Sequence, residues 1–171
     1  MKSVKIEAQA DPLCAIAQPV SLESLALRSG QRVDLPDRPT LDCVTAATFA
    51  SFVDEALAPL VKGSFGASIT AIATGPGFEC RTRDYVAGAK LSEHAAGLAI
   101  DIASITFGGG RVYQVGQMTD AAERAFDHAA RAAACGYFHT ALGPGADSFH
   151  NNHWHVDLEA RGRDGKSKFC Q

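Results

Sequence analysis

Two spacings of apolar residues along the chain predict a mixture of helices and strands. A helix is predicted over residues 44–58, because apolar positions recur there at helical intervals and Asp42 can cap the first turn. Pro59 is expected to end or kink this helix. Its predicted apolar face consists of Ala47, Phe49, Phe52, Val53 and Leu57.

A second helix is predicted over the alanine-rich run that follows Thr119 and Asp120. Either residue can serve as the N-cap, Glu123 is placed to complete a capping box, and Gly136 is expected to end the helix. The region between the two helices has a different periodicity, which is typical of strands.

Alternating or β-branched runs predict strands over residues 68–74, 98–105, 111–115 and 153–158. Three consecutive glycines between the second and third runs indicate a hairpin. In the second run, Asp101 points to the face opposite that of Ile100 and Ile102, as expected for a half-buried strand. This order of elements predicts an α+β fold with a small, mainly antiparallel sheet flanked by helices.

Length and composition indicate one folded domain. A chain of 171 residues buries enough surface for a single core, and its 46% hydrophobic and 20% charged residues exclude wholesale disorder. Residues 1–17 are aperiodic and are expected to form a tail or irregular lead-in to a domain over residues 18–171. We expect this domain to be a monomer.

Charge and hydropathy exclude two classes of partner. A net charge of −3, without a run of basic residues interleaved with aromatic ones, excludes a general attraction to nucleic acid. No apolar stretch approaches the length needed to cross a bilayer, so no membrane span is expected. The start, MKSVKIEAQADP, lacks the apolar core of a secretory signal, so an exported protein would already have lost its signal.

The five cysteines are widely spaced and contain no C-x-x-C pair, which argues against a four-thiolate zinc knuckle. Such spacing in a small domain is typical of exported, disulfide-stabilised proteins. We predict a disulfide between Cys43 and Cys80 and another between Cys135 and Cys170, which leaves Cys14 without an assigned partner. The alternative is that several of them are buried thiols of a cytosolic protein.

Metal-binding side chains concentrate in two segments, SEHAAGLAID at residues 92–101 and HNNHWHVD at residues 150–157. Strand alternation places His153, His155 and Asp157 on one face. Burying these groups near Asp101 is costly unless a metal ion or mutual hydrogen bonds satisfy them. His94 precedes small residues, so a tight turn can bring its imidazole beside Asp101. Imidazole and carboxylate together favour zinc, with one ligand position open.

The pattern S-x-H-x-x-G-x-A-x-D followed by H-x-H resembles the zinc metallopeptidases related to lysostaphin, bacterial D-alanyl-D-alanine carboxypeptidases and the Hedgehog signalling domain. From about residue 19 to residue 170, the chain more specifically resembles the bacterial extensin-like C-terminal domain. The closer resemblance rests on LDC at 41–43, FECR at 78–81, LSEHAAGLAIDIA at 91–103, LGPGAD at 142–147 and HNNHWHVDL at 150–158.

The resemblance implies that His94, Asp101 and His155 bind one zinc ion per chain and that His153 is the catalytic group. It also makes His150, five residues before the last ligand, similar to a histidine of the murein endopeptidase branch. The carboxypeptidase branch instead has a glutamate three residues before that ligand, where this chain has Asn152. A histidine is therefore expected to act as the base.

Three further residues have expected supporting roles. Arg81 is a candidate for stabilising the negative charge that develops on the substrate oxygen, because the resembled group has an arginine in a similar loop. The alternative for Arg81 and the nearby Arg83 is a solvated surface charge. Ser92 is expected to form a hydrogen bond near His94, and Asp157 is expected to orient a ligand histidine.

These expectations predict a zinc-dependent hydrolase that cleaves a peptide or amide bond by activating water. The resemblance implies that the substrate is bacterial peptidoglycan, and it places the protein in the periplasm or outside the cell, which agrees with the predicted disulfides. The first alternative is a binding module that keeps the zinc without catalysis. The second is a structural, wall-associated protein in which metal binding is incidental.

Overall fold

The computed structural model describes residues 1–171 as an α+β domain with two sheets. The strands of the larger sheet are β3 (Ser24–Ala26), β4 (Arg32–Asp34), β6 (Ile69–Thr74), β7 (Ala99–Phe107), β8 (Val112–Gln114), β9 (Thr140–Leu142), β10 (Trp154–Asp157) and β11 (Phe169–Cys170). Seven of them lie in the order β11-β9-β10-β7-β6-β4-β3, and β8 pairs with β7. The smaller sheet has the order β1-β2-β5, formed by Lys2–Ser3, Pro19–Ser21 and Thr40–Asp42.

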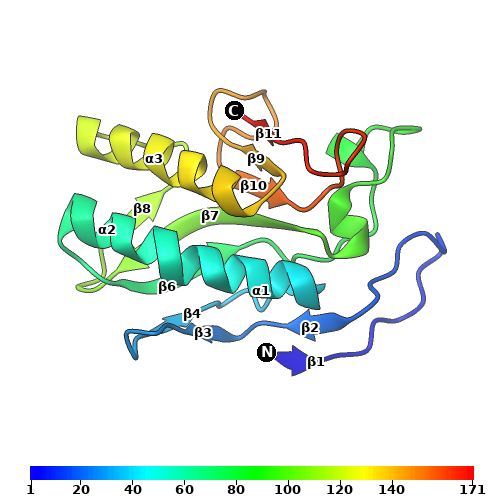
Figure 1. Ribbon diagram of the computed structural model, residues 1–171, viewed down its shortest axis with the longest axis horizontal. Coiled ribbons are helices and arrows are strands. Elements are labelled where there is room, and N and C mark those ends of the chain that lie inside the picture. Colours follow the sequence, from blue (N-terminus) through cyan, green and yellow to red (C-terminus); the bar gives the residue numbers. More distant parts are fainter.

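Most strand pairs are antiparallel, and the two parallel pairs in the larger sheet are β4 with β6 and β9 with β11. The principal helices are α1 (Cys43–Phe52), α2 (Ala58–Phe65) and α3 (Ala121–Tyr137), and they lie together in front of the larger sheet (Figure 1). A continuous apolar core separates these helices from the sheet. The predicted fold class is therefore confirmed.

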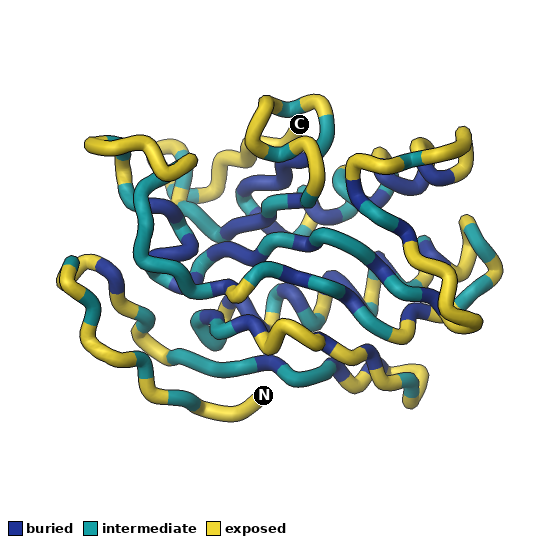
Figure 2. Tube along the Cα trace, turned by 180° about the vertical axis from the view of Figure 1, so that it is seen from behind, coloured by how far each residue is buried: buried dark blue, intermediate teal, exposed yellow.

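The opposite face of the larger sheet, seen in Figure 2, has no helix over its centre and is only partly buried. Along β7 the side chains of Ile100, Ile102 and Ile105 are fully buried, whereas Asp101 and Ala103 are partly exposed. The alternation predicted from the sequence thus gives the sheet an apolar face towards the helices and a more polar face. Asp101 lies on the polar face.

The first helix extends beyond Pro59, where the sequence predicts its end or a kink. A π-helical turn, Val53–Leu57, joins α1 to α2, and Pro59 lies in the first turn of α2. Proline has no backbone N–H and is therefore tolerated in the first turn of α2, and the wider turn before it lets the helix continue to Phe65, with Gly66 as its C-cap.

By length and composition alone, the continuous helix Cys43–Phe65 would be long and apolar enough to cross a membrane, contrary to the sequence-based expectation. The same test is passed by core helices of globular domains. Its side chains Phe49, Phe52 and Leu57 are fully buried in the core between the helices and the sheet, as in a core helix.

Asp120, one of the two predicted N-cap residues, caps the second helix, and Glu123 completes the predicted reciprocal arrangement with Thr119, the residue before the cap, in place of the cap itself. The side chain of Asp120 accepts a hydrogen bond from the backbone N–H of Glu123 at 2.8 Å, and the Glu123 carboxylate accepts one from the backbone N–H of Thr119 at 2.8 Å. The helix continues one residue past Gly136, to Tyr137.

Two disulfides connect the terminal segments to the domain. The predicted bond between Cys135 and Cys170 is confirmed, but the prediction that Cys43 pairs with Cys80 is wrong. Cys80 is bonded to Cys14, at a Cα–Cα distance of 5.4 Å, and Cys43 is free. The reason is that residues 1–17 pass beside the loop of Cys80 after β1 pairs with β2, whereas Cys43 begins α1 and lines a groove on another part of the surface.

Candidate metal centre

The pairing of β7 with β10 brings the two segments of metal-binding residues together. Asp101 of β7 and His155 of β10 are direct cross-strand partners, with Nδ1 of the imidazole 2.9 Å from Oδ1 of the carboxylate. Side chains at such paired positions share one face of the sheet. On the opposite face, the Trp154 indole N–H donates to the buried carboxylate of Asp127 on α3 at 2.8 Å, which fixes β10 against the helix layer.

His94 reaches the centre from a short 3₁₀ turn, Glu93–Ala96, immediately before β7. Ser92 caps this turn, because its hydroxyl accepts a hydrogen bond from the backbone N–H of His94 at 3.4 Å. The ring Nδ1–H of His94 donates to the backbone carbonyl of Gly77 at 2.7 Å. With Nδ1 used in this way, the Nε2 lone pair of His94 points towards Asp101 and His155.

Gly97 ends this turn in a left-handed conformation, with φ of 67°. A Cβ atom there would lie 2.5 Å from Cδ1 of Ile16 and 2.8 Å from the backbone nitrogen of Asp42. The sequence predicts only that small residues make this turn tight. The structure shows that two distant segments also close around Gly97.

We expect Gly97→Ala to destabilise the protein by about 2 kcal/mol or more and to weaken metal binding, because the turn that carries His94 must shift. Gly66→Ala is the matched control: Gly66 also has a left-handed conformation, with φ of 65°, but no atom lies within 4 Å of its would-be Cβ. Chemical denaturation and zinc titration of both variants measure the difference. Equal losses in the two variants would contradict the role assigned to the close contacts.

The three candidate ligand atoms lie close to the spacing of ligands around a zinc ion. His94 Nε2 is 3.3 Å from Asp101 Oδ1 and 3.3 Å from His155 Nδ1, and the third separation is 2.9 Å. Ligand atoms about 2.1 Å from a tetrahedral zinc ion lie about 3.4 Å from one another. Two of the three separations are close to this value, and the third, between Asp101 Oδ1 and His155 Nδ1, is the shorter distance of a direct hydrogen bond. These three residues also form the metal-capable cluster of the structure.

Without a metal ion, one proton occupies the position where these atoms converge. His155 Nε2–H donates to Asp157 Oδ2 at 3.2 Å, and its Nδ1–H is directed at Asp101 and His94. Burial opposes the charge on His155, yet the hydrogen bonds to Asp101 and Asp157 raise its pKa to about 9. Burial likewise opposes the charge on Asp101, but the hydrogen bond from His155 holds the pKa of this carboxylate well below its usual range. The site thus holds a cation, which a metal ion can replace.

This charge predicts that metal binding depends on pH. Below the His155 pKa of about 9, the ring must lose its Nδ1 proton before it can bind a metal, so zinc affinity should rise about tenfold per pH unit between pH 7 and 9 and then level off. Calorimetry in two buffers of different ionisation enthalpy should detect about one proton released per zinc at pH 7. Zinc affinity that is independent of pH over this range would contradict the prediction.

The two remaining predicted histidines lie beside the centre. His153 Nε2 is 3.7 Å from Asp101 Oδ1, and its Nδ1–H donates to Asn152 Oδ1 at 2.9 Å. Burial lowers the pKa of His153, and the nearby Asp101 carboxylate only partly opposes this shift. The ring centroid of His150 is 5.3 Å from that of His153, and its Nδ1 binds the Asp147 carboxylate at 2.7 Å.

Arg81 lines the same cavity as His150 and His155, which has a volume of about 200 Å³. Its Nε–H donates to Glu79 at 2.8 Å, and its guanidinium lies 4.7 Å from the centre of the Tyr85 ring. The Tyr85 hydroxyl donates to the same Glu79 carboxylate at 2.7 Å. Two partners therefore hold the arginine in place beside the centre.

Several groups at the site could not be predicted from the sequence, because the tertiary fold determines their partners. The carbonyl of Gly77 orients His94, and Asp147 orients His150. Arg83, for which the alternative was a solvated charge, lines the cavity and forms an ion pair with Glu159, 76 residues away. A backbone carbonyl leaves no signal in a sequence, and an ion pair at such separation has no characteristic spacing.

Comparison with known proteins places the chain in a family. No curated protein and no solved structure matches the chain. The family model described as "Extensin-like protein C-terminus" matches residues 1–171. The resemblance expected from the LDC, FECR and HNNHWHVDL segments is thereby confirmed, and the chain belongs to the family of extensin-like protein C-termini.

Proposed function

We propose that the protein is a zinc-dependent hydrolase that cleaves a peptide bond in bacterial peptidoglycan. The observation that carries this proposal is the convergence of His94, Asp101 and His155 at zinc-binding distances, with His153 beside them. The donor set fits zinc, because two imidazoles and one carboxylate leave one of four positions open for water or substrate. One zinc ion per chain would be held by these three residues.

A zinc ion bound there would lower the pKa of a bound water to about 7 and polarise the scissile carbonyl. His153 is suited to accept the proton of the attacking water. Its Nδ1–H is engaged by Asn152, so the lone pair of Nε2 is available, and its lowered pKa keeps the ring neutral at pH 7. The same ring can then deliver the proton to the leaving amine.

His150, whose ring lies near those of His153 and His155, supports this proton transfer. Because Asp147 accepts from Nδ1–H, the Nε2 atom of His150 is the one free to contact substrate or water. The His150 ring lies 5.5 Å from that of His155 and 5.3 Å from that of His153, measured between centroids. In the absence of a glutamate at position 152, this pair of histidines supplies the acid–base groups.

Arg81 is placed to stabilise the negative charge that grows on the carbonyl oxygen as the bond is attacked. Its Nε and Nη1 atoms are used within the protein, by Glu79 and the carbonyl of Thr82, whereas Nη2 has no protein partner. The guanidinium is thus fixed in orientation and still has a donor for substrate. This arrangement costs little reorganisation during the reaction.

The identity of the substrate rests on the similarity of the S-x-H-x-x-G-x-A-x-D and H-x-H patterns to zinc metallopeptidases that act on bacterial cell walls. Two disulfides are typical of an oxidising compartment, which supports a periplasmic or extracellular location where peptidoglycan is accessible. A zinc-containing module that binds the wall without cleaving it is the second candidate, since the same three ligands would serve it equally well.

The test is the release of peptide fragments from purified peptidoglycan by the protein, together with elemental analysis of bound metal. We expect about one zinc per chain, with cleavage that stops on chelation and returns when zinc is restored. Bound zinc without cleavage of any wall peptide would favour the binding module. A folded protein that binds no zinc would refute both candidates.

A further inference from the structure

A polar cavity of about 200 Å³ adjoins the candidate metal centre, with His155 in its wall. Only two of its 13 lining residues are hydrophobic, and three of them are arginines: Arg81, Arg83 and Arg161. Arg81 has a proposed role at the reacting carbonyl. The other two arginines come from different segments and have no role in the proposed chemistry. Their loops lie side by side at the right of Figure 1.

Arg83 and Arg161 share one carboxylate. Glu159 accepts a hydrogen bond from Arg83 Nη2 at 2.6 Å, and Arg161 Nη2 pairs with its other oxygen. Arg83 also binds Glu93 at 3.2 Å, and Arg161 Nε–H donates to the hydroxyl of Thr140 at 3.0 Å. The two guanidinium groups are therefore held in fixed positions on either side of Glu159.

Both arginines have N–H groups that form no hydrogen bond within the protein. Arg83 Nε and Nη1, and Arg161 Nη1, have no protein partner. Guanidinium groups prefer planar, two-point contacts with carboxylates, and a group already fixed by other bonds loses less entropy when it binds.

The acidic residues of the cavity are mostly engaged elsewhere. Asp157 accepts from His155 and from the backbone N–H of Glu159, and Asp147 accepts from His150. Glu93 accepts from Arg83, and only Asp84 has no hydrogen-bond partner. These carboxylates would repel a doubly charged phosphate more than a singly charged group. A carboxylate is therefore the anion that fits this cavity best.

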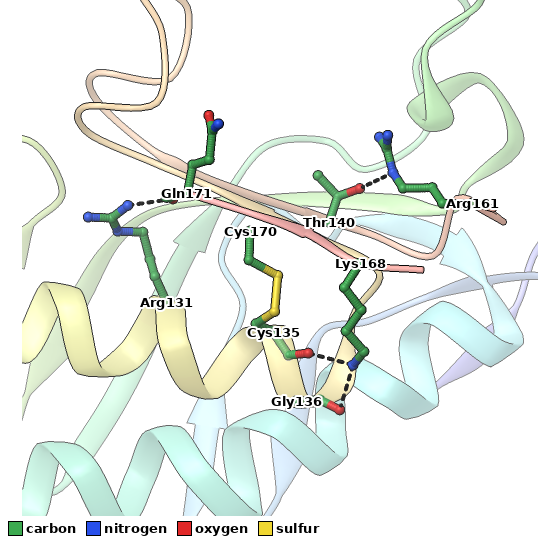
Figure 3. Close-up of a disulfide and its surroundings, with 8 residues drawn as sticks. All are labelled: Arg131, Cys135, Gly136, Thr140, Arg161, Lys168, Cys170 and Gln171. Atoms are coloured by element: carbon green, nitrogen blue, oxygen red, sulfur yellow. Dashed lines mark hydrogen bonds between the residues drawn. A yellow bond between two sulfur atoms is a disulfide. The ribbon is translucent and has the colours of Figure 1, made fainter. Parts of the chain in front are cut away.

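The segment that carries Arg161 is attached firmly to the domain (Figure 3). The disulfide between Cys135 and Cys170 ties it to α3, and the Lys168 ammonium donates to the carbonyls of Cys135 and Gly136. On the cavity side, the Arg161 guanidinium lies 5.3 Å from the centre of the Phe169 ring. Arg161 thus lines the cavity on a segment that is fixed to α3.

We propose that Arg83 and Arg161 form a subsite that binds a carboxylate group of the peptide substrate, next to the bond to be cleaved. This inference rests on the proposed function in taking a peptide as the ligand. It predicts that the protein distinguishes a peptide with a free carboxylate from the same peptide in which that group is an amide.

The experiment compares N-acetyl-alanyl-alanine with its C-terminal amide, in both D and L forms, by calorimetric binding and by cleavage. We expect the wild type to bind the acid about 10- to 100-fold more tightly than the amide, as for a charge-assisted contact. Arg83→Gln and Arg161→Gln should each reduce this preference at least about fivefold while leaving affinity for the amide unchanged.

Lys90→Gln is the matched control. Lys90 binds the same Glu159 carboxylate at 2.6 Å but does not line the cavity, so its loss removes a cation from the network without removing a proposed contact. We expect this variant to keep the preference for the acid, and thermal unfolding checks that all three variants remain folded. A Lys90→Gln variant that loses the preference as fully as the arginine variants would overturn the assignment.

The subsite and the proposed function can fail separately. Tighter binding of the acid without cleavage of either peptide or of peptidoglycan supports the subsite and counts against the hydrolase. Cleavage of peptidoglycan with equal affinity for the peptide acid and its amide overturns the subsite and supports the proposed hydrolase. Absence of binding to the acid by the wild type overturns the subsite in either case.

Discussion

Replacing Asp101 by asparagine is expected to lower zinc affinity by at least about 100-fold and to abolish hydrolysis. The carboxylate lies within 3.3 Å of both ligand nitrogens, and it supplies the one negative charge among the three ligands. Loss of a group that merely orients a ligand typically costs 10- to 100-fold in metal affinity, so loss of a ligand should cost more. Zinc retained after dialysis and the rate of peptide release are the measurements.

The same substitution should remove the stabilisation that zinc confers. At a free zinc concentration about 1,000 times its dissociation constant, binding stabilises the wild type by about 4 kcal/mol, which for a domain of this size corresponds to about 10 °C in melting temperature. Asp34→Asn on β4 is the control, because Asp34 is an exposed residue of the same sheet that pairs only with Arg32. An Asp101→Asn protein that still gained the full thermal shift would remove this residue from the metal site.

Changing His153 to alanine is expected to reduce hydrolysis by about 10² to 10⁴ while zinc stays bound. The ring faces Asp101 through Nε2 at 3.7 Å but is not one of the three converging ligands. The loss should appear in kcat more than in KM, since the proton transfer is made in the transition state. Metal content and steady-state rates on a soluble wall peptide distinguish the two effects.

His128→Ala provides the matched histidine control, because His128 is an exposed residue on α3 and does not line the cavity. Its zinc content and rate should equal those of the wild type. If His153→Ala lost its zinc as well as its activity, His153 would belong with the ligands. If it kept full activity, the proton would have to move through another group, of which His150 is the nearest.

Most of the regular elements could be predicted because their signals are local. The strand predicted over residues 98–105 and the N-cap at Asp120 depend on neighbours in the chain, and both predictions are confirmed. The effect of Pro59 was harder to predict, since a widened turn before a proline depends on how the helix packs. The edge strand β11 could not be predicted either, because two residues are too few to show the alternation of apolar and polar positions that marks a strand.

The candidate site was predictable to the extent that its residues lie in two short segments. His94 and Asp101 share one segment, and His155 lies in the other, on a strand whose alternation marks the polar face. The contacts that complete the cavity were not predictable, because Arg83 and Glu159 are 76 residues apart and meet only in the folded domain. The partner of Cys80 was not predictable for the same reason, because residues 1–17 have no periodic pattern that would place Cys14 beside it.

The pairing of Asp101 with His155 also has a consequence for the order of folding. These residues are 54 positions apart, and β8, α3 and β9 lie between them in the chain. Closing so long a loop is slow compared with forming helices or hairpins, so the complete ligand set should arise only when β10 joins β7. Zinc uptake during refolding would then report the moment at which the centre of the sheet closes, after the helices have already formed.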